Sequence, residues 1–129
     1  MRVTLAGVAK ILIVDDDQDT RQLLKIRLEA KGYETAFAWD AVTAISATRE
    51  ALPDLILLDF GLPGGDAVVV MERLQSFPAL ADIPVVVVSA REPSATGGRA
   101  LAAGALAYVQ KPIDNEELLG AIRSALHEE

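Results

Sequence analysis

The sequence predicts an α/β fold: a single doubly wound parallel sheet of five strands with five helices on its two faces. Short apolar runs and longer segments of helical periodicity alternate five times, which is typical of parallel strands connected by helices. Several apolar runs have no polar break, as expected of strands buried on both faces. The length of 129 residues corresponds to one domain, and right-handed crossovers make such a sheet doubly wound.

The first strand is expected at residues 10–14, and three consecutive aspartates follow it. Apolar residues recur on one face of residues 18–31 while charges fill the other, so this segment is expected to be a helix. Asp17 suits the N-cap of that helix and Gly32 its C-cap. Residues 33–38 form a weaker strand because polar residues interrupt it.

The central strand is expected at residues 54–59, where four aliphatic residues run up to Asp59. An alanine-rich helix at residues 40–51 precedes it and ends before Pro53. A helix at residues 65–77 follows. Its run of β-branched residues is poor helix chemistry, so tertiary packing must hold it.

A fourth buried strand is expected at residues 83–88 and ends at a serine. A helix at residues 94–103 follows it. Gly97 and Gly98 lie inside this helix and each costs roughly 1 kcal/mol relative to alanine. We therefore predict that the helix frays or starts late.

The last strand is expected at residues 106–109 and the last helix at residues 115–127. Asp114 and Glu117 fit a capping box at the start of this helix. The single histidine, His127, lies in its last turn, where a cation suits the helix dipole. We do not interpret it as a phosphodonor.

Composition excludes several classes of function. The net charge of −7 is wrong for direct binding of nucleic acid or of an anionic membrane surface. There is no cysteine and no apolar run of the roughly 20 residues that a membrane span needs. Residues 1–9 are interpreted as an N-terminal extension without a signal peptide, and residues 10–127 as the domain. A cytoplasmic protein is expected.

Reactive side chains follow the predicted strands. Asp15 and Asp16 end the first strand, Asp59 the third and Ser89 the fourth, and Lys111 follows the fifth. In open parallel sheets ligands bind outside the carboxyl ends of the strands. An aspartate there is either a turn or cap residue, which is common, or a reacting group.

A set of residues occurs in a recognisable order: the acidic strand end at residues 11–16, Asp59 with Pro63 in the loop after it, the pair Ser89 and Ala90, Tyr108, and the pair Lys111 and Pro112. Together they resemble the receiver domain of bacterial two-component response regulators. The resemblance covers nearly the whole chain. It implies a flavodoxin-like sheet with strand order 2-1-3-4-5, which periodicity alone does not supply.

In that strand order the acidic strand ends lie in one crevice. Three carboxylates with ordinary pKa values of about 4 are ionised at neutral pH, and Lys111 offsets only one charge. A divalent cation that prefers oxygen resolves the repulsion, and Mg²⁺ is the usual choice in cells. By resemblance, Asp16, Asp59 and the backbone carbonyl of Gly61 are direct ligands and Asp15 acts through water.

The resemblance also implies the roles of the site residues. Asp59 is the phosphoacceptor for a phosphoryl group from a sensor histidine kinase or histidine phosphotransfer protein. Lys111 and Ser89 contact the phosphoryl oxygens, and Ser89 and Tyr108 form the switch. The surface of the fourth helix, fifth strand and fifth helix would then bind a downstream effector or form a homodimer. Such a domain assists its own phosphorylation and dephosphorylation but is not an enzyme in the ordinary sense.

Two alternatives differ in function: a degenerate receiver, and an enzyme on the same architecture such as a flavin carrier or a phosphatase. A degenerate receiver acts as an interaction module that never takes phosphate, but it would have lost an acid or Lys111, and all are present. A flavin carrier wants a phosphate loop after the first strand, where this chain has Asp15, Asp16 and Asp17. A phosphatase of the haloacid type wants a second aspartate at position 61, where this chain has glycine.

Overall fold

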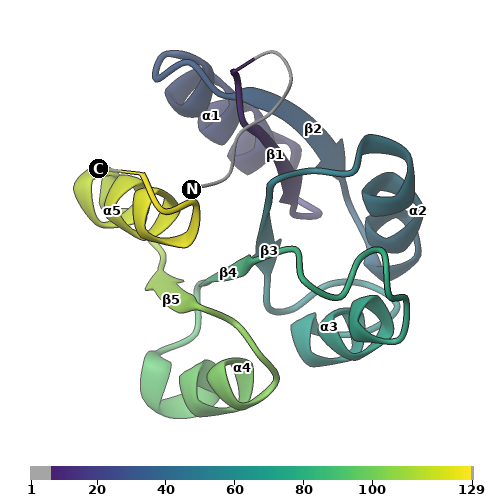
Figure 1. Ribbon diagram of the computed structural model, residues 1–129. Helices are drawn as coiled ribbons and strands as arrows, with labels where there is room; N and C mark the ends of the chain where they lie inside the picture. The colour runs from purple at the N-terminus through teal and green to yellow at the C-terminus, as the bar shows by residue number, and fades with distance from the viewer. Residues whose placement is uncertain (1–6, 129) are drawn as a thin grey trace.

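The computed structural model describes residues 7–128, and the five strands form one parallel sheet in the order β2-β1-β3-β4-β5 (Figure 1). This is the order that the resemblance implies. The strands are β1 Lys10–Val14, β2 Glu34–Ala38, β3 Leu55–Asp59, β4 Val85–Ser89 and β5 Ala107–Gln110. The helices are α1 Gln18–Glu29, α2 Ala41–Ala51, α3 Ala67–Gln75, α4 Gly98–Ala102 and α5 Asn115–Ala125. Most of the expected N-terminal extension, residues 1–6, lies outside the described residues.

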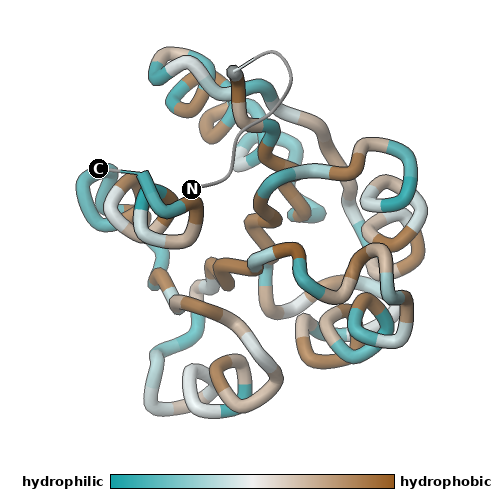
Figure 2. The backbone as a smooth tube through the Cα atoms, viewed as in Figure 1, coloured by the Kyte–Doolittle hydropathy of each residue, from teal (hydrophilic) through white to brown (hydrophobic). Residues whose placement is uncertain are grey.

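Two hydrophobic clusters sandwich the sheet. Because side chains alternate along a strand, Leu12 and Val14 of β1 face one cluster while Ile11 and Ile13 face the other. The first cluster includes residues of α2, α3 and α4, and the second includes residues of α1 and α5. Figure 2 shows the resulting concentration of hydrophobic residues along the central strands.

The central strand β3 is buried on both faces up to its last residue. Leu55 to Leu58 are at most 1% exposed. β3 pairs with β1 on one side, with Leu58 beside Val14, and with β4 on the other, with Asp59 beside Val88. This double coverage explains the unbroken apolar run and puts Asp59 where the burial ends.

Aspartates cap four of the helices. Asp17 accepts a hydrogen bond from the amide of Asp19 at the start of α1, as predicted. The reciprocal capping box is found at α2, between Asp40 and Thr43, and not at α5. At α5, Asp114 accepts hydrogen bonds from the amides of Glu116 and Glu117 as a simple N-cap.

Helices α1, α3 and α5 each end earlier than the periodicity predicts. α1 ends at Glu29, and a turn stabilised by the hydrogen bond from Gly32 N to Glu29 O completes it. Gly32 has φ +90°, which a residue with a side chain rarely adopts. α5 ends at Ala125, so His127, with φ +58°, lies beyond the helix and not in its last turn.

The segment before β5 is not the continuous α-helix predicted at residues 94–103. Residues Pro93–Gly97 form a π-helical turn, and the α-helical part α4 covers only Gly98–Ala102. The predicted late start is therefore confirmed. The pair of glycines removes the side chains that would favour regular α-helical bonding over this turn.

Replacing Gly98 by alanine is expected to raise the free energy of unfolding by about 0.5–1 kcal/mol. Its φ is −63°, and an added Cβ meets nothing within 4 Å. Gly97→Ala is the matched control, because its Cβ would lie 3.3 Å from Pro93 Cβ, so its gain should be smaller. Chemical denaturation measures both variants. A loss of stability in Gly98→Ala would contradict this account of the segment.

Candidate functional site

Three carboxylates meet at the carboxyl edge of the sheet. Asp15 and Asp16 directly follow β1, and Asp59 ends the neighbouring strand β3. One carboxylate oxygen from each residue lies within 4.8 Å of the other two. Asp15 is buried, Asp59 is half-buried and Asp16 is exposed, so the cluster has one open side.

Lys111 supplies the positive charge of this cluster. Its Nζ lies 2.8 Å from Asp15 Oδ2 and 3.3 Å from Asp59 Oδ1. The Lys111 amide donates to the carbonyl of Ser89 at 2.7 Å, which fixes the backbone after β5 against the end of β4. One ammonium faces three carboxylates, so ionisation of all three leaves two negative charges unbalanced.

The electrostatics of the site follow from burial and crowding. Burial raises the pKa of Asp59 to about 6; Lys111 opposes the rise, and the charges of Asp15 and Asp16 add to it. Burial also disfavours the charged form of Lys111. The hydrogen bond from Lys111 to Asp15 and the charge of Asp59 outweigh that effect and raise the pKa of Lys111, which stays protonated.

The donor set fits a hard divalent cation. The three clustered carboxylates offer oxygen ligands, and their excess negative charge is what a bound cation would neutralise. Gly61, the predicted carbonyl ligand, lies exposed in the loop after β3. A Cβ at Gly61 would lie 3.8 Å from Arg91 Nη2, so the Arg91 guanidinium borders this loop.

Ser89 and Tyr108 are connected through the backbone of Arg91. Ser89 is buried at the end of β4, and its Oγ accepts a hydrogen bond from the Arg91 amide at 3.0 Å. The Tyr108 hydroxyl donates to the Arg91 carbonyl at 2.9 Å. It also makes a hydrogen bond with Thr96 Oγ1 of the π-helical turn. The two predicted switch residues are thus linked by a chain of hydrogen bonds and do not touch.

Two polar residues of this region, Thr96 and Arg99, escaped the sequence analysis. Thr96 is buried, and its position inside a predicted helix gives no sign of a tyrosine partner. Arg99 of α4 pairs with Asp66 at 3.2 Å, and its guanidinium lies 5.4 Å from the centre of the Phe60 ring. Only the fold brings these residues together, since Asp66 and Arg99 lie far apart in the sequence.

The remaining candidate acids have structural contacts. Asp17 accepts hydrogen bonds from Thr20 Oγ1 and the Asp19 amide, and these lower its pKa. Asp54 accepts a hydrogen bond from the Lys10 amide at 2.8 Å. Asp66 is the N-cap of α3. The N-cap role that the sequence predicted for Asp17 is therefore confirmed.

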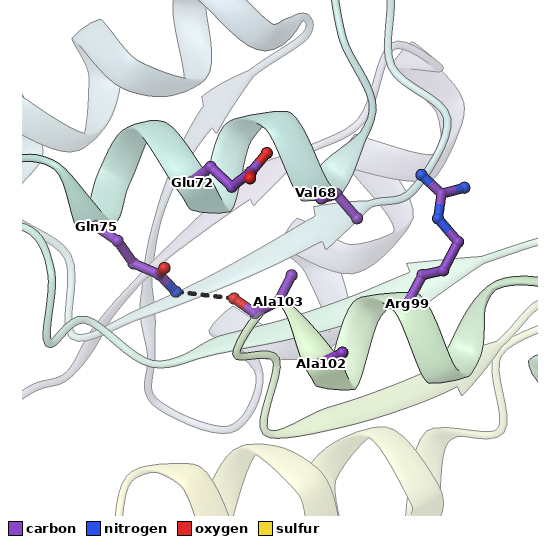
Figure 3. Close-up of a pocket in the computed structure, with 6 residues that line it drawn as sticks. All are labelled: Val68, Glu72, Gln75, Arg99, Ala102 and Ala103. Carbon is purple, nitrogen blue, oxygen red and sulfur yellow. Dashed lines mark hydrogen bonds between the residues drawn. The ribbon is translucent and has the colours of Figure 1, made fainter.

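A groove of about 400 Å³ between α3 and α4 contains none of the clustered carboxylates (Figure 3). Val68, Glu72 and Gln75 line it from α3 and Arg99 from α4. At one end Gln75 Nε2 donates to the carbonyl of Ala103 at 2.8 Å. The groove is separate from the acidic crevice, and the Gln75 contact ties the end of α4 to α3.

Comparison with known proteins identifies the family. The family model described as response regulator receiver domain matches residues 11–123. The response regulator PleD of Caulobacter vibrioides is 38% identical over 116 residues, which cover 90% of this chain and 26% of PleD. The DNA-binding response regulator MtrA of Mycobacterium tuberculosis is 36% identical over 117 residues, covering 91% of this chain and 50% of MtrA. The chain thus spans between a quarter and a half of the length of these relatives.

Solved structures agree with the sequence comparisons. A putative response regulator from Chloroflexus aurantiacus has a TM-score of 0.86 and 29% identity, covering 94% of this chain and 99% of its own. A CheY-like response regulator receiver domain protein from Methanospirillum hungatei has a TM-score of 0.84 and 28% identity, with coverages of 93% and 94%. Within residues 7–128, no helix is long and apolar enough to cross a membrane.

Replacing Asp59 by asparagine is expected to stabilise the metal-free protein by roughly 1–3 kcal/mol at neutral pH. The folded pKa of Asp59 is about 6, above the ordinary value of about 4. Between about pH 4 and pH 6, the folded state therefore keeps a proton on Asp59 that the unfolded chain has released. Stability from this group falls as the pH rises from about 4 to about 6.

Urea denaturation between pH 4 and pH 8 in the presence of a chelator measures the effect. In the Asp59→Asn variant, the free energy of unfolding should no longer fall over this pH range. Asp82→Asn, which changes an exposed carboxylate outside the cluster, should retain this fall. An Asp59→Asn variant that is less stable than the wild type at neutral pH would contradict the electrostatic account.

Proposed function

Because the chain belongs to the response regulator receiver domain family, we propose that it is a phosphorylation-dependent signalling switch with Asp59 as its phosphoacceptor. The observation that carries this proposal is the contact of one lysine, Lys111, with Asp15 and Asp59 inside a cluster of three carboxylates. A module that only binds partners would have no use for three carboxylates whose mutual repulsion destabilises the folded state. The domain is proposed to cover residues 10–127 and to be cytoplasmic.

The chemistry is a transfer of a phosphoryl group to a carboxylate. An oxygen of Asp59 attacks the phosphorus of a phosphohistidine on a sensor histidine kinase or histidine phosphotransfer protein. The P–N bond breaks, the imidazole leaves and an acyl phosphate remains. A Mg²⁺ held by Asp16, Asp59 and the Gly61 carbonyl, with Asp15 acting through water, would neutralise charge on the transferring oxygens. Lys111 already contacts Asp59, and its ammonium would donate to one of these oxygens.

The burial of Asp59 suits this role. A carboxylate with a raised pKa is a stronger base, and the ammonium of Lys111 contacts one of its two oxygens. The same groups assist hydrolysis of the acyl phosphate, so the chain takes part in its own phosphorylation and dephosphorylation. It remains a signalling module, with the phosphodonor as its partner.

Phosphorylation is proposed to act on the bonds around Arg91. The phosphoryl group carries roughly −1.5 to −2 charges in place of the single charge of the carboxylate, and it brings three strong acceptors. Ser89 Oγ now accepts from the Arg91 amide, and a shift of Oγ toward a phosphoryl oxygen to which its O–H donates would lengthen that bond. The Arg91 carbonyl accepts a hydrogen bond from the Tyr108 hydroxyl, which also forms a hydrogen bond with Thr96 Oγ1. Movement at Ser89 thereby reaches the segment before α4.

The output surface is proposed to be α4, β5 and α5. The π-helical turn before α4 lowers the free energy needed to rearrange this region. At the other end of α4, the hydrogen bond from Gln75 to the Ala103 carbonyl fixes the helix against α3. A downstream effector protein or domain would bind this surface, or a second copy would pair through it. Relatives such as MtrA are named as DNA-binding response regulators. The net charge of −7 argues against direct contact with DNA for this chain.

Incubation with acetyl phosphate and Mg²⁺ is expected to add one phosphoryl group, detected by intact-mass spectrometry. Asp59→Asn should add none, because the amide is not a nucleophile, and chelation of the metal should prevent the reaction. Lys111→Met should slow it by about 10²-fold, the usual effect of removing one preorganised donor. Asp82→Asn is the matched control and should react like the wild type. A wild type that stays unmodified with Mg²⁺ would favour the interaction-module alternative.

The Tyr108→Phe variant should still be phosphorylated but should respond less. Removing its hydroxyl breaks the bonds to Thr96 and Arg91, so the signal from Ser89 loses its path to α4. Nuclear magnetic resonance measures the response as the change in amide shifts of residues 91–110 on phosphorylation. Thr96→Val should reduce the change in the same residues. Equal shift changes in the wild type and both variants would refute the proposed route.

A further inference from the structure

A second groove lies between α2 and α3 and takes no part in the proposed switch. α2 and α3 run side by side over one face of the sheet (Figure 1). The groove has a volume of about 330 Å³ and is lined by Val42, Ile45, Ser46, Arg49, Arg73, Ser76 and Phe77. None of these residues belongs to the acidic cluster or to the surface of α4, β5 and α5.

The groove is lined by positive charge, although the net charge of the protein is negative. Arg49 and Arg73 lie in the last turns of α2 and α3, and both are exposed. In the described part of the chain, neither makes a salt bridge, whereas Lys25, Arg99 and Lys111 all do. Two unpaired guanidinium groups therefore border one groove of a chain whose net charge is −7.

The floor between the arginines is apolar. The Arg49 guanidinium lies 4.1 Å from the centre of the Phe77 ring, a cation–π contact that holds it over the groove. Val42 is 66% exposed, and Trp39, which directly precedes the N-cap of α2, is 51% exposed. An apolar side chain of a partner that covers Val42 would remove this surface from water, which is favourable.

We propose that this groove docks an acidic, amphipathic segment of a partner protein. Carboxylates of the segment pair with Arg49 and Arg73, and an apolar side chain packs on Phe77 and Val42. The net charge of −7 opposes every acidic partner, but it opposes the densely charged surfaces of nucleic acids and membranes more strongly than a short segment with few carboxylates. The groove between α3 and α4 offers no such preference, because Glu72 and Arg99 line it with opposite charges.

The test is a nuclear magnetic resonance titration with a synthetic peptide in which pairs of glutamates alternate with pairs of leucines. Amides of residues 42–49 and 73–77 should shift in a saturable way. Arg49→Gln and Arg73→Gln should each weaken binding by about threefold to fivefold, as expected for one exposed ion pair, and added salt should weaken it too. Lys31→Gln is the control, since Lys31 is an exposed cation just after α1, which packs on the other face of the sheet.

Several results would overturn the proposal. The peptide might shift no groove amides, or bind Arg49→Gln and Arg73→Gln as tightly as the wild type. A peptide with lysine in place of glutamate that shifts the same amides equally would remove the role of charge. Groove shifts that depend on protein concentration without peptide would identify a second copy of the chain as the occupant.

Discussion

The contact of Lys111 with Asp15 and Asp59 is the interaction on which the account of this protein depends. It joins the end of β1, the end of β3 and the loop after β5, three segments that are distant in the sequence. It is also incomplete, because a third carboxylate, Asp16, stands in the same cluster and one ammonium cannot neutralise all three. The fold therefore maintains a site in which repulsion between carboxylates remains unbalanced until more positive charge binds.

The sheet produces this site through its register. Pairing of Val14 with Leu58 and of Asp59 with Val88 brings the strand ends to a common edge. Helices cover both faces, so the strands leave the hydrophobic core only at that edge. The burial that stabilises the fold is thus the same burial that raises the pKa of Asp59, and stability and reactivity have one physical origin.

Much of this arrangement could be predicted from the sequence. Apolar runs located all five strands, and Asp17 was correctly expected to cap α1. Strand order required the family resemblance, because hydrophobic periodicity does not tell which strands are neighbours. Given that order, the meeting of Asp15, Asp16, Asp59 and Lys111 follows directly.

The rest depended on tertiary contacts. The capping box was assigned to Asp114 and Glu117, but Asp40 and Thr43 form it, because a cap sequence does not determine which rotamers close the box. The hydrogen bond between Thr96 and Tyr108 joins a turn to a strand, and the ion pair of Arg99 with Asp66 joins α4 to the start of α3, which only packing brings together. Unpaired arginines such as Arg49 also cannot be recognised until all their neighbours are known.

The most direct test of the central claim is calorimetric titration of the unphosphorylated protein with Mg²⁺. The excess of carboxylate over ammonium charge predicts saturable binding of one ion, strongly weakened in Asp16→Asn. Asp16 is exposed and makes no contact with Lys111, so this variant should fold normally. Absence of saturable binding, or equal affinity in the wild type and Asp16→Asn, would contradict the claim that this crevice is built to receive a cation.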